Sequence, residues 1–493
     1  MGIGENAGQS VGENVGSSGY TTPTGFGDWQ LAAGHFMPSL VEAPLEIIQP
    51  QPLLTVSNRY YKQYPGIEYN VRVGVIGGSY PYLYELTTSP AGMTIDSSTG
   101  EITWNNPVES GSPHNIVVKV TDQELTTDTV SWTLIVNTSN IYFVDSNAAT
   151  SGTGTISDPF KTWEDARVGS LLTDTLYFRT GTYLRSDITV GSSWHTTGSN
   201  KWLAFPGETP AFDFDVTGTD SQIQLYGNDT YIDGLIFFST SSPQRCIATW
   251  PNSLRTVFRR NTCSGIIGAE GQNPSYLFNQ SNGGSGSGVT TYSYVESNTV
   301  ITPSIGAYLF LMYSTDYALI ENNNSDGVSD DLISPKDENS YIWIRRNELV
   351  NHNGDSISKI QSYNTHTVIV YEYNNFLQTS AENTTVVFQA IGSAFYYQRN
   401  TFYGLPAIDT RYGATNINFK RNVIVNNNSG GNPATTGNEE WWVKWVVTSS
   451  NSGQMTFEDN IAANVAVGVI DSNGLLTGTN RTTYLGILGH EVA

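Results

Sequence analysis

The sequence predicts an all-β protein in which a β-sandwich precedes a right-handed parallel β-helix (solenoid). Three observations predict this fold. The 493 residues include 48 glycines and 28 tyrosines, a composition typical of β-structure with many turns. Short alternating strands at even spacing fill residues 53–138. After residue 139, a motif that ends in asparagine recurs at the interval expected for one solenoid coil.

Residues 1–52 form a Gly/Pro-rich segment that we expect to be flexible or to serve in docking. The motif GEN-x-G occurs twice there, and the first basic residue of the chain is Arg59. Neither the basic region nor the apolar region of a secretory signal peptide is visible. We therefore expect an extracellular or virion-associated protein, whose signal has been removed or which leaves its cell by lysis or on a particle.

Residues 53–138 alternate polar and apolar residues in segments such as YNVRVGV, HNIVVKVTDQ and VSWTLIV. Short strands with turn signals between them predict a β-sandwich. The stretch PAGMTIDSSTGEITW, followed by VKVTD, resembles the Ig (cadherin-like) modules of bacterial and phage surface proteins. The resemblance implies a spacer or an adhesion unit, and we expect a spacer.

Residues 139–493 are expected to form the β-helix. They begin with IYFVDSNAATSGTGTISDPFKTWEDA at 141–166, which resembles the opening segment of pectate-lyase-like parallel β-helix proteins. In those proteins a short amphipathic segment after the loop caps the N-terminal end of the solenoid. The resemblance therefore implies a cap at DPFKTWEDA, because an open solenoid end exposes strand edges and apolar core.

The repeat aligns the segments TVFRRN, YVESN, LIENN, WIRRN, VYEYN, YYQRN, NFKRN and TFEDN. Their final residues are Asn261, Asn298, Asn323, Asn347, Asn374, Asn400, Asn422 and Asn460. The spacings are 37, 25, 24, 27, 26, 22 and 38, so the central values match one coil and the long ones admit insertions. Asn tolerates the left-handed conformation of a sharp turn, and stacked Asn side chains can hydrogen-bond along the solenoid. Aromatic residues such as Trp343 and Tyr371 are expected mainly in the core. We expect the axis to run from about residue 141 to about residue 485.

A second strand lies about eleven residues before each asparagine, as in LFLMYS, LISPKDE, ISKIQSY, VVFQAIG and IDTRYG. Alternate residues of a strand face the same way. When the strands are matched by their apolar positions, one outward column holds Met312, Lys336, Gln361, Gln389 and Arg411. The neighbouring outward column holds Ser334, Lys359 and Asp409. Coils stack roughly 4.8 Å apart, so Lys336, Lys359 and Arg411 are predicted to form a basic row in a shallow groove.

The stretch DDLISPKDE, followed one coil later by GDSISKIQ, resembles the paired motif of alginate-lyase-type β-helix families. The resemblance implies β-elimination of an acidic, uronate-containing polysaccharide, with Lys336 as the base and Lys359 as its partner. Two departures are present: those families have Arg followed by His where this chain has Lys359-Ile360, and Pro335 removes a ladder donor. The candidate catalytic residues are Lys336, Lys359 and Arg411. The candidate substrate-binding residues are Gln361, Tyr363, Gln389, Asp409, Tyr412 and His352.

Three roles are open for the acidic residues around the basic row of Lys336, Lys359 and Arg411. Calcium is a candidate cofactor, because the carboxylates of Asp326, Asp330, Asp331 and Asp355 could supply the oxygen ligands it prefers. Pairs such as Asp331 with Asp355, or Asp355 with Asp409, could instead hydrolyse a glycosidic bond, as in phage tailspikes of this fold. The same acids could also be solvated turn residues, in which case the protein is a non-catalytic adhesin.

The net charge and the hydropathy of the chain disfavour two classes of partner, nucleic acids and membranes. Lys and Arg number 23 against 45 Asp and Glu, so the net charge of −22 disfavours nucleic acid. The chain has no run of 18 apolar residues, so membrane insertion is not expected. The expected partner is a polysaccharide, with a homotrimer or attachment to a larger particle through the N-terminal segment as further alternatives. Cys246 and Cys263 could form a disulfide or remain thiols.

Overall fold

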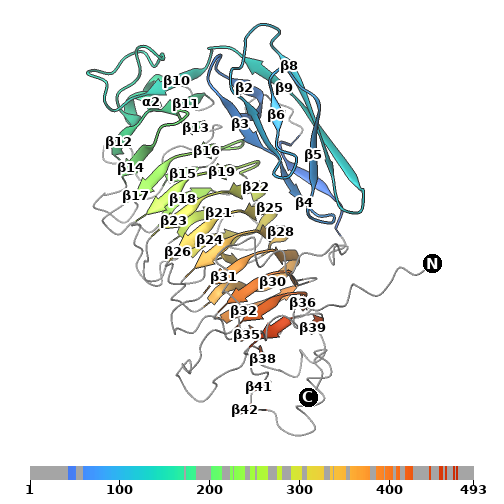
Figure 1. Ribbon diagram of the computed structural model, residues 1–493. Coiled ribbons are helices and arrows are strands. Elements are labelled where there is room, and N and C mark those ends of the chain that lie inside the picture. Colours follow the sequence, from blue (N-terminus) through green and yellow to red (C-terminus); the bar gives the residue numbers. More distant parts are fainter. Residues whose placement is uncertain are drawn as a thin grey trace, which may run out of the picture.

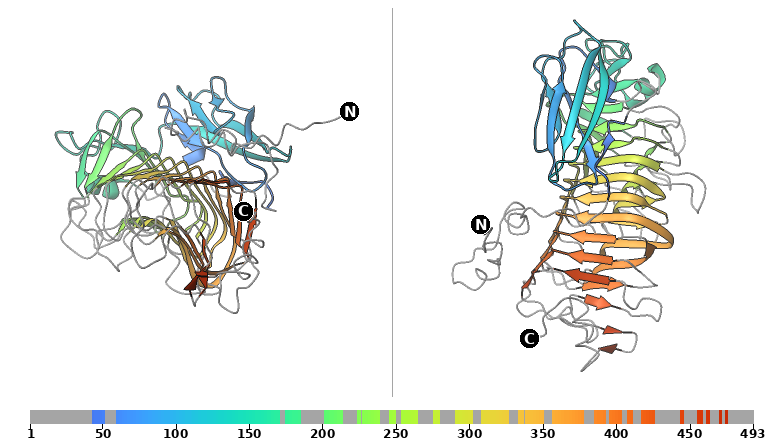
Figure 2. Two further views of the ribbon diagram at one scale, coloured as in Figure 1. Left: turned by 60° about the horizontal axis from the view of Figure 1, so that its bottom comes forward. Right: turned by 90° about the vertical axis from the view of Figure 1, so that its right-hand side faces the viewer.

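A computed structural model shows a β-sandwich and a long parallel β-helix lying side by side (Figures 1 and 2). The structure describes residues 43–51, 59–170, 174–184, 201–213, 223–225, 227–238, 245–249, 253–264, 275–279, 290–301, 308–326, 333–336, 338–350, 356–377, 385–392, 395–403, 407–410, 417–425, 443–445, 455–458, 461–463, 470–471 and 474–475. Strands dominate these residues, which confirms the predicted all-β class.

The N-terminal part is the predicted β-sandwich. One sheet has the strand order β2-β9-β8-β5 and the other β3-β7-β6, while β1 pairs with β4. The elements are β1 (Glu46–Gln49), η2 (Arg59–Tyr61), β2 (Lys62–Gln63), β3 (Tyr69–Arg72), β4 (Gly74–Ile76), β5 (Leu83–Thr88), β6 (Thr94–Ile95), β7 (Glu101–Trp104), β8 (His114–Thr121) and β9 (Thr127–Val136). Alternate residues of β8, such as Ile116 and Val118, are buried, as expected for strands with one core-facing side. Strand β1 precedes residue 53, so the end of the N-terminal segment is part of the sandwich.

The rest of the described chain winds mainly into a parallel β-helix with three sheets, which we number in the order that the chain visits them in each coil. Sheet I contains β15 (Ile223–Leu225), β18 (Arg245–Thr249), β21 (Ser275–Asn279), β24 (Tyr308–Tyr313), β27 (Ile333–Lys336), the first part of β30 (Ser356–Glu372), β32 (Thr385–Gly392), β35 (Ala407–Thr410) and β38 (Val443–Trp445). Sheet II contains β10 (Ile141–Val144), β11 (Thr175–Phe178), β13 (Lys201–Ala204), β16 (Tyr231–Asp233), β19 (Val257–Arg259), β22 (Thr290–Glu296), β25 (Thr315–Glu321), β28 (Ser340–Arg345), the last part of β30, β33 (Phe395–Gln398), β36 (Ile417–Lys420) and β39 (Met455–Glu458). Sheet III contains β12 (Gly181–Leu184), β14 (Pro210–Asp213), β17 (Ile236–Phe238), β20 (Thr262–Ser264), β23 (Thr299–Ile301), β26 (Asn324–Asp326), β29 (Glu348–Val350), β31 (Asn375–Leu377), β34 (Thr401–Tyr403), β37 (Val423–Val425) and β40 (Ile461–Ala463).

An asparagine ladder runs along the turn from sheet II to sheet III, as the repeat predicted. From Asn261 to Asn400, each side-chain amide donates to the Oδ1 atom of the asparagine one coil further on, at 2.9 to 3.1 Å, and Asn422 is the last acceptor. The left-handed residue of the turn is the one before each asparagine, for example Arg346 (φ 56°) before Asn347. The asparagine therefore stabilises the turn through its side chain, while its neighbour takes the unusual backbone conformation. Asn460 lies outside the described residues.

Helix α2 (Trp163–Gly169) caps the N-terminal end of the β-helix, in agreement with the implied cap. The Oγ1 atom of Thr162 accepts from the backbone N–H of Asp165, whose carboxylate accepts from the backbone N–H of Thr162. The ring of Trp163 is fully buried and lies 5.6 Å from that of Trp202 and 4.8 Å from that of Phe212. The helix thus covers the apolar residues of the first coils.

Stacked aromatic rings fill part of the solenoid interior, as expected. Tyr371 and Tyr397 are fully buried, and their ring centroids are 4.4 Å apart. Phe376 and Phe402 stack at 4.9 Å on the neighbouring sheet. Cys263 is a buried free thiol.

The C-terminal end of the described β-helix differs from the expected axis. Strand β40 ends the parallel stack at residue 463, and β41 (Ile470–Asp471) and β42 (Gly474–Leu475) pair antiparallel. Within the described ranges, the stack therefore stops before residue 485. No helix in those ranges is long and apolar enough to cross a membrane.

The sandwich packs along sheet II, so the expectation of a spacer is wrong (Figures 1 and 2). One hydrophobic cluster contains the sandwich core together with an outward column of sheet II that includes Tyr231, Leu319 and Trp343. Within this cluster, the ring of Tyr60 lies edge-on to that of Tyr231, at 5.8 Å. Because the two parts share one core, the sandwich cannot swing as an independent module.

A second outward column of sheet II carries buried charges. Its successive residues are Asp233, Arg259, Glu296, Glu321, Arg345 and Glu372. The sign alternates except where Glu296 and Glu321 are neighbours. Arg72 of the sandwich supplies the missing cation. Its Nη1 lies 3.4 Å from the carboxylate of Glu296, and its Nη2 lies 3.4 Å from that of Glu321. The alternation is therefore complete only when the sandwich is docked.

Candidate functional site

The predicted site lies on sheet I, next to the sheet that the sandwich covers. Lys336 ends β27 and pairs with Gln361 of the next coil, which pairs with Gln389. These three residues lie in one column, as predicted. The preceding member of the column is Tyr313, so the prediction of Met312 was wrong. Met312 pairs with Pro335 and is buried, which places it in the adjacent, core-facing column.

Lys359 occupies the neighbouring column. It pairs with Val387, which pairs with Asp409, so Lys359 and Asp409 share a column, as predicted, with one coil between them. Asp409 pairs in turn with Lys444 of β38, a lysine that sequence reasoning missed. The signal was present in the alternation of VKW, in which Lys444 stands between two apolar residues. The column therefore carries lysine at two coils and aspartate at a third.

The remaining predicted residues are not all brought together. Tyr363 lies in β30, two residues after Gln361. Asp326 ends β26 on sheet III, a different sheet from that of Lys336. The predicted residues outside the described ranges are Arg411, Tyr412, His352, Asp330, Asp331 and Asp355. Within the described ranges, no group of three or more His, Cys, Asp or Glu side chains is placed to hold a metal ion.

Asp316 is a titratable residue that sequence reasoning missed. It lies in β25, which precedes β27 and Lys336 in the sequence. It pairs with Ser340, which opens β28 shortly after Lys336. Burial raises the pKa of the Asp316 carboxyl, a hydrogen bond with Ser340 opposes this, and the charge of Glu338 raises the pKa further. A carboxyl group with a raised pKa can keep its proton nearer to neutral pH and donate it to a leaving oxygen.

Three stacked tyrosines lie at the turn between sheets I and II. Tyr292, Tyr317 and Tyr341 have left-handed backbones, and successive ring centroids are 5.1 Å apart. Their stacked faces contact one another, so the column does not offer each ring face to a sugar. Trp343 is buried, but between the β-helix and the sandwich, so the expectation that it fills the solenoid core is wrong.

Comparison with known proteins supports the sandwich directly. The family described as "Putative Ig domain" (He_PIG) matches residues 50–137, the region of the observed sandwich. No curated protein matches the chain.

Two solved structures resemble the chain weakly. The structure of a hyperthermoactive exopolygalacturonase from Thermotoga maritima is 10% identical, with a TM-score of 0.37, over 62% of this chain and 85% of that one. The structure of pectate lyase Pel9A is 14% identical, with a TM-score of 0.34, over 72% of this chain and 89% of that one. Such scores carry no argument about activity, and the β-helix fold rests on the strand registers described above.

Proposed function

We propose that the protein binds an acidic, uronate-containing polysaccharide along sheet I and cleaves it by β-elimination. The observation that carries the proposal is the column Lys336–Gln361–Gln389, with Lys359 in the adjoining column one coil away. Strand alternation puts Lys336 on the side of β27 that carries the buried Ser334, opposite the column of Met312 and Pro335. On a protein of net charge −22, Lys336 and Lys359, in adjoining columns of successive coils, supply the local positive charge that an anionic glycan requires.

In the proposed reaction, neutral Lys336 removes the proton at C5 of the uronate. The electron pair of that C–H bond forms a double bond between C4 and C5 as the bond from C4 to the glycosidic oxygen breaks. The departing oxygen takes up a proton from water or from an acidic side chain beside it. Lys359 would attract the uronate carboxylate, and its positive charge would favour the neutral form of Lys336.

The other predicted residues are assigned to substrate binding. Gln361 and Gln389 would hydrogen-bond the hydroxyl groups of successive sugar units, because both stand in the column of Lys336, which we call the lysine column. Asp409, Tyr363, Arg411, Tyr412 and His352 remain proposed contacts of the flanking units.

Calcium is the proposed cofactor. The carboxylates of Asp330, Asp331 and Asp355 flank β27 and β30 in the sequence, and hard oxygen ligands of this kind fit calcium. When bound, the ion would neutralise a uronate carboxylate and so acidify the C5 proton. Asp326 is the weakest of the four candidates, because it stands on sheet III.

A panel of alginate, pectate and neutral polysaccharides tests this function. We expect ultraviolet absorbance from an unsaturated uronate on at least one acidic glycan. New reducing ends without that absorbance would indicate hydrolysis and not elimination, with paired carboxylates as the catalysts. Binding without cleavage would leave an adhesin. Because such glycans are found outside cells, we propose an extracellular protein, and a mass measurement of the assembled state tests the homotrimer and particle-attached alternatives.

A further inference from the structure

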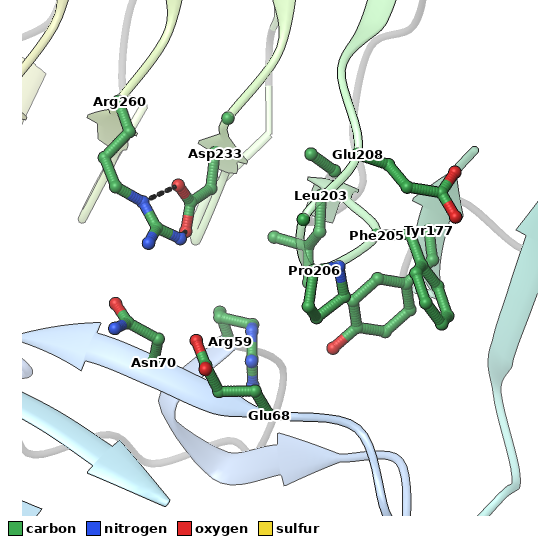
Figure 3. A pocket seen from close by; sticks show the side chains of 13 residues that line it. Arg59, Glu68, Asn70, Tyr177, Leu203, Phe205, Pro206, Glu208, Asp233 and Arg260 are labelled. Carbon is green, nitrogen blue, oxygen red and sulfur yellow. Dashed lines mark hydrogen bonds and ion pairs between the residues drawn. The ribbon is translucent and has the colours of Figure 1, made fainter. Parts of the chain in front are cut away.

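A pocket lies at the seam between the sandwich and the first coils of the β-helix, away from the lysine column. Its volume is about 290 Å³. The sandwich contributes Arg59, Glu68 and Asn70, and the β-helix contributes residues 203–208, Tyr177, Asp233, Gly234 and Arg260 (Figure 3). Ligand pockets usually measure about 300–1,000 Å³, so this one suits a single small ring and not a polymer.

The sandwich side of the pocket holds a buried arginine with an unused donor. Arg59 is only 3% exposed. Its Nη1 donates to the carbonyl of Lys62 at 2.8 Å, and its guanidinium lies 4.9 Å from the ring centroid of Tyr69. Its Nε has no hydrogen-bond partner among the described residues. A buried donor of this kind is unfavourable until a ligand or a water molecule accepts from it.

The charges that line the pocket are almost all paired within the protein. Arg260 donates to both carboxylate oxygens of Asp233, at 2.7 and 2.8 Å. Glu208 accepts from Arg179 at 2.7 Å. Glu68, half-buried, forms no ion pair or side-chain hydrogen bond with the described residues. One cation, Arg59, and one anion, Glu68, thus remain for a ligand, so the pocket favours one with no net charge.

The β-helix side of the pocket combines the paired charges of Asp233, Arg260 and Glu208 with one apolar wall. Leu203, Phe205, Pro206 and Tyr177 form this wall, across from Arg59 and Glu68 (Figure 3). A pyranose ring has apolar C–H faces and hydroxyl groups on its rim. Its faces suit an apolar wall, and neighbouring hydroxyls can hydrogen-bond in pairs to a planar guanidinium or carboxylate.

We propose that this seam pocket binds one unit of a neutral saccharide. Arg59 and Glu68 hydrogen-bond its hydroxyl groups, and Phe205 and Pro206 contact the ring. The site is distinct from the lysine column of sheet I and does not depend on cleavage there. Since both parts of the protein build the pocket, the bound sugar also stabilises the docked sandwich.

Titration of the full chain with the methyl glycosides of glucose, galactose and mannose tests the proposal. Calorimetry and saturation-transfer NMR should show one site for at least one of these probes. Glu68→Gln and Phe205→Ala should each weaken binding about tenfold, because a charge-assisted hydrogen bond or the wall contact is lost. Glu68→Gln should keep the melting temperature of the wild type, since Glu68 has no described partner to lose.

Two control variants separate this proposal from others. Glu85→Gln, in an exposed ion pair with Lys119 on the sandwich, should bind the probes as the wild type does. Lys336→Ala should also bind them normally, so failure of the elimination proposal would leave this result intact. Absence of binding by the wild type, or equal binding by Glu68→Gln and Phe205→Ala, would overturn the proposal. Preferential binding of glycine betaine would mean a site for a zwitterion and would overturn the saccharide assignment.

Discussion

The guanidinium of Arg72 in the sandwich lies 3.4 Å from the carboxylate of Glu321 in the β-helix, and both side chains are buried. Glu321 also pairs with Arg345 at 3.0 Å and accepts a hydrogen bond from the hydroxyl of Tyr294 at 2.6 Å. Charge pairing thus reinforces the apolar contact between the two parts. The covered sheet is fixed by this contact, and the lysine column lies on the sheet beside it.

Arg72→Met removes the cation between Glu296 and Glu321 and leaves two neighbouring buried carboxylates. Breaking a buried pair in this way should lower the free energy of unfolding by about 3–5 kcal/mol, measured by urea denaturation. Lys119→Met is the matched control, because it breaks the exposed pair with Glu85 and should cost less than about 1 kcal/mol. Equal, small losses in the two variants would contradict the role given to Arg72.

Glu321 makes the interface sensitive to acid. Burial raises its pKa, but Arg72 and Arg345 outweigh burial and hold the pKa at about 2, below the usual 4.5. A carboxyl whose pKa is lowered by folding contributes stability above its unfolded pKa, and that stability is lost as the pH falls toward the folded pKa. Urea midpoints of the wild type should therefore decrease as the pH falls from 4.5 toward 2. Glu321→Gln should decrease less steeply, and a slope equal to that of the wild type would show that Glu321 is not responsible.

Asn347→Ala tests the asparagine ladder. Asn347 donates to Asn374 at 2.9 Å and to the carbonyl of Ile320 at 3.0 Å, and it accepts from Asn323 at 3.0 Å. Alanine leaves these buried partners unsatisfied, so we expect a loss of about 2–4 kcal/mol in the free energy of unfolding. Asn106→Ala, at an exposed position of the sandwich, should change it by less than about 0.5 kcal/mol. A ladder variant as stable as Asn106→Ala would refute the structural role.

The ladder could be predicted because the same side chain recurs at one corner of every coil. The docking of the sandwich was missed, although a signal for it exists. In IWIR, Ile342 and Ile344 face the solenoid core while Trp343 between them faces the sandwich. Apolar residues at consecutive positions are typical of a strand that is buried on both sides. The sequence does not indicate that Arg345, the next residue, is buried, because its partners Glu321 and Tyr82 are distant along the chain.

The candidate site could be predicted only in part for a related reason. The column through Lys336, Gln361 and Gln389 is correct, because those strands alternate clearly. The strand before them reads LFLMYS, in which consecutive apolar residues fit either register, and the match selected Met312 where Tyr313 belongs. Asp316 could not be found from sequence, since its raised pKa depends on burial and on Glu338.

Removal of divalent ions tests the calcium proposal. Excess EDTA should abolish most of the cleavage of an acidic glycan, and added calcium should restore it, because the ion would neutralise the uronate carboxylate. Asp355→Asn should raise the calcium concentration needed for half-maximal activity. Activity and melting temperature that are unchanged in EDTA would exclude a calcium-dependent mechanism.

The most direct test of the proposed function compares the wild type with Lys336→Ala on the acidic glycan that the panel identifies. The initial rate of unsaturated-uronate formation is the measurement, with Lys119→Ala as a control on the sandwich. We predict that Lys336→Ala loses at least about a hundredfold in rate and keeps its melting temperature, because a general base contributes that much or more. A Lys336→Ala variant that forms the unsaturated product at the wild-type rate would contradict the assignment of the base and of the site.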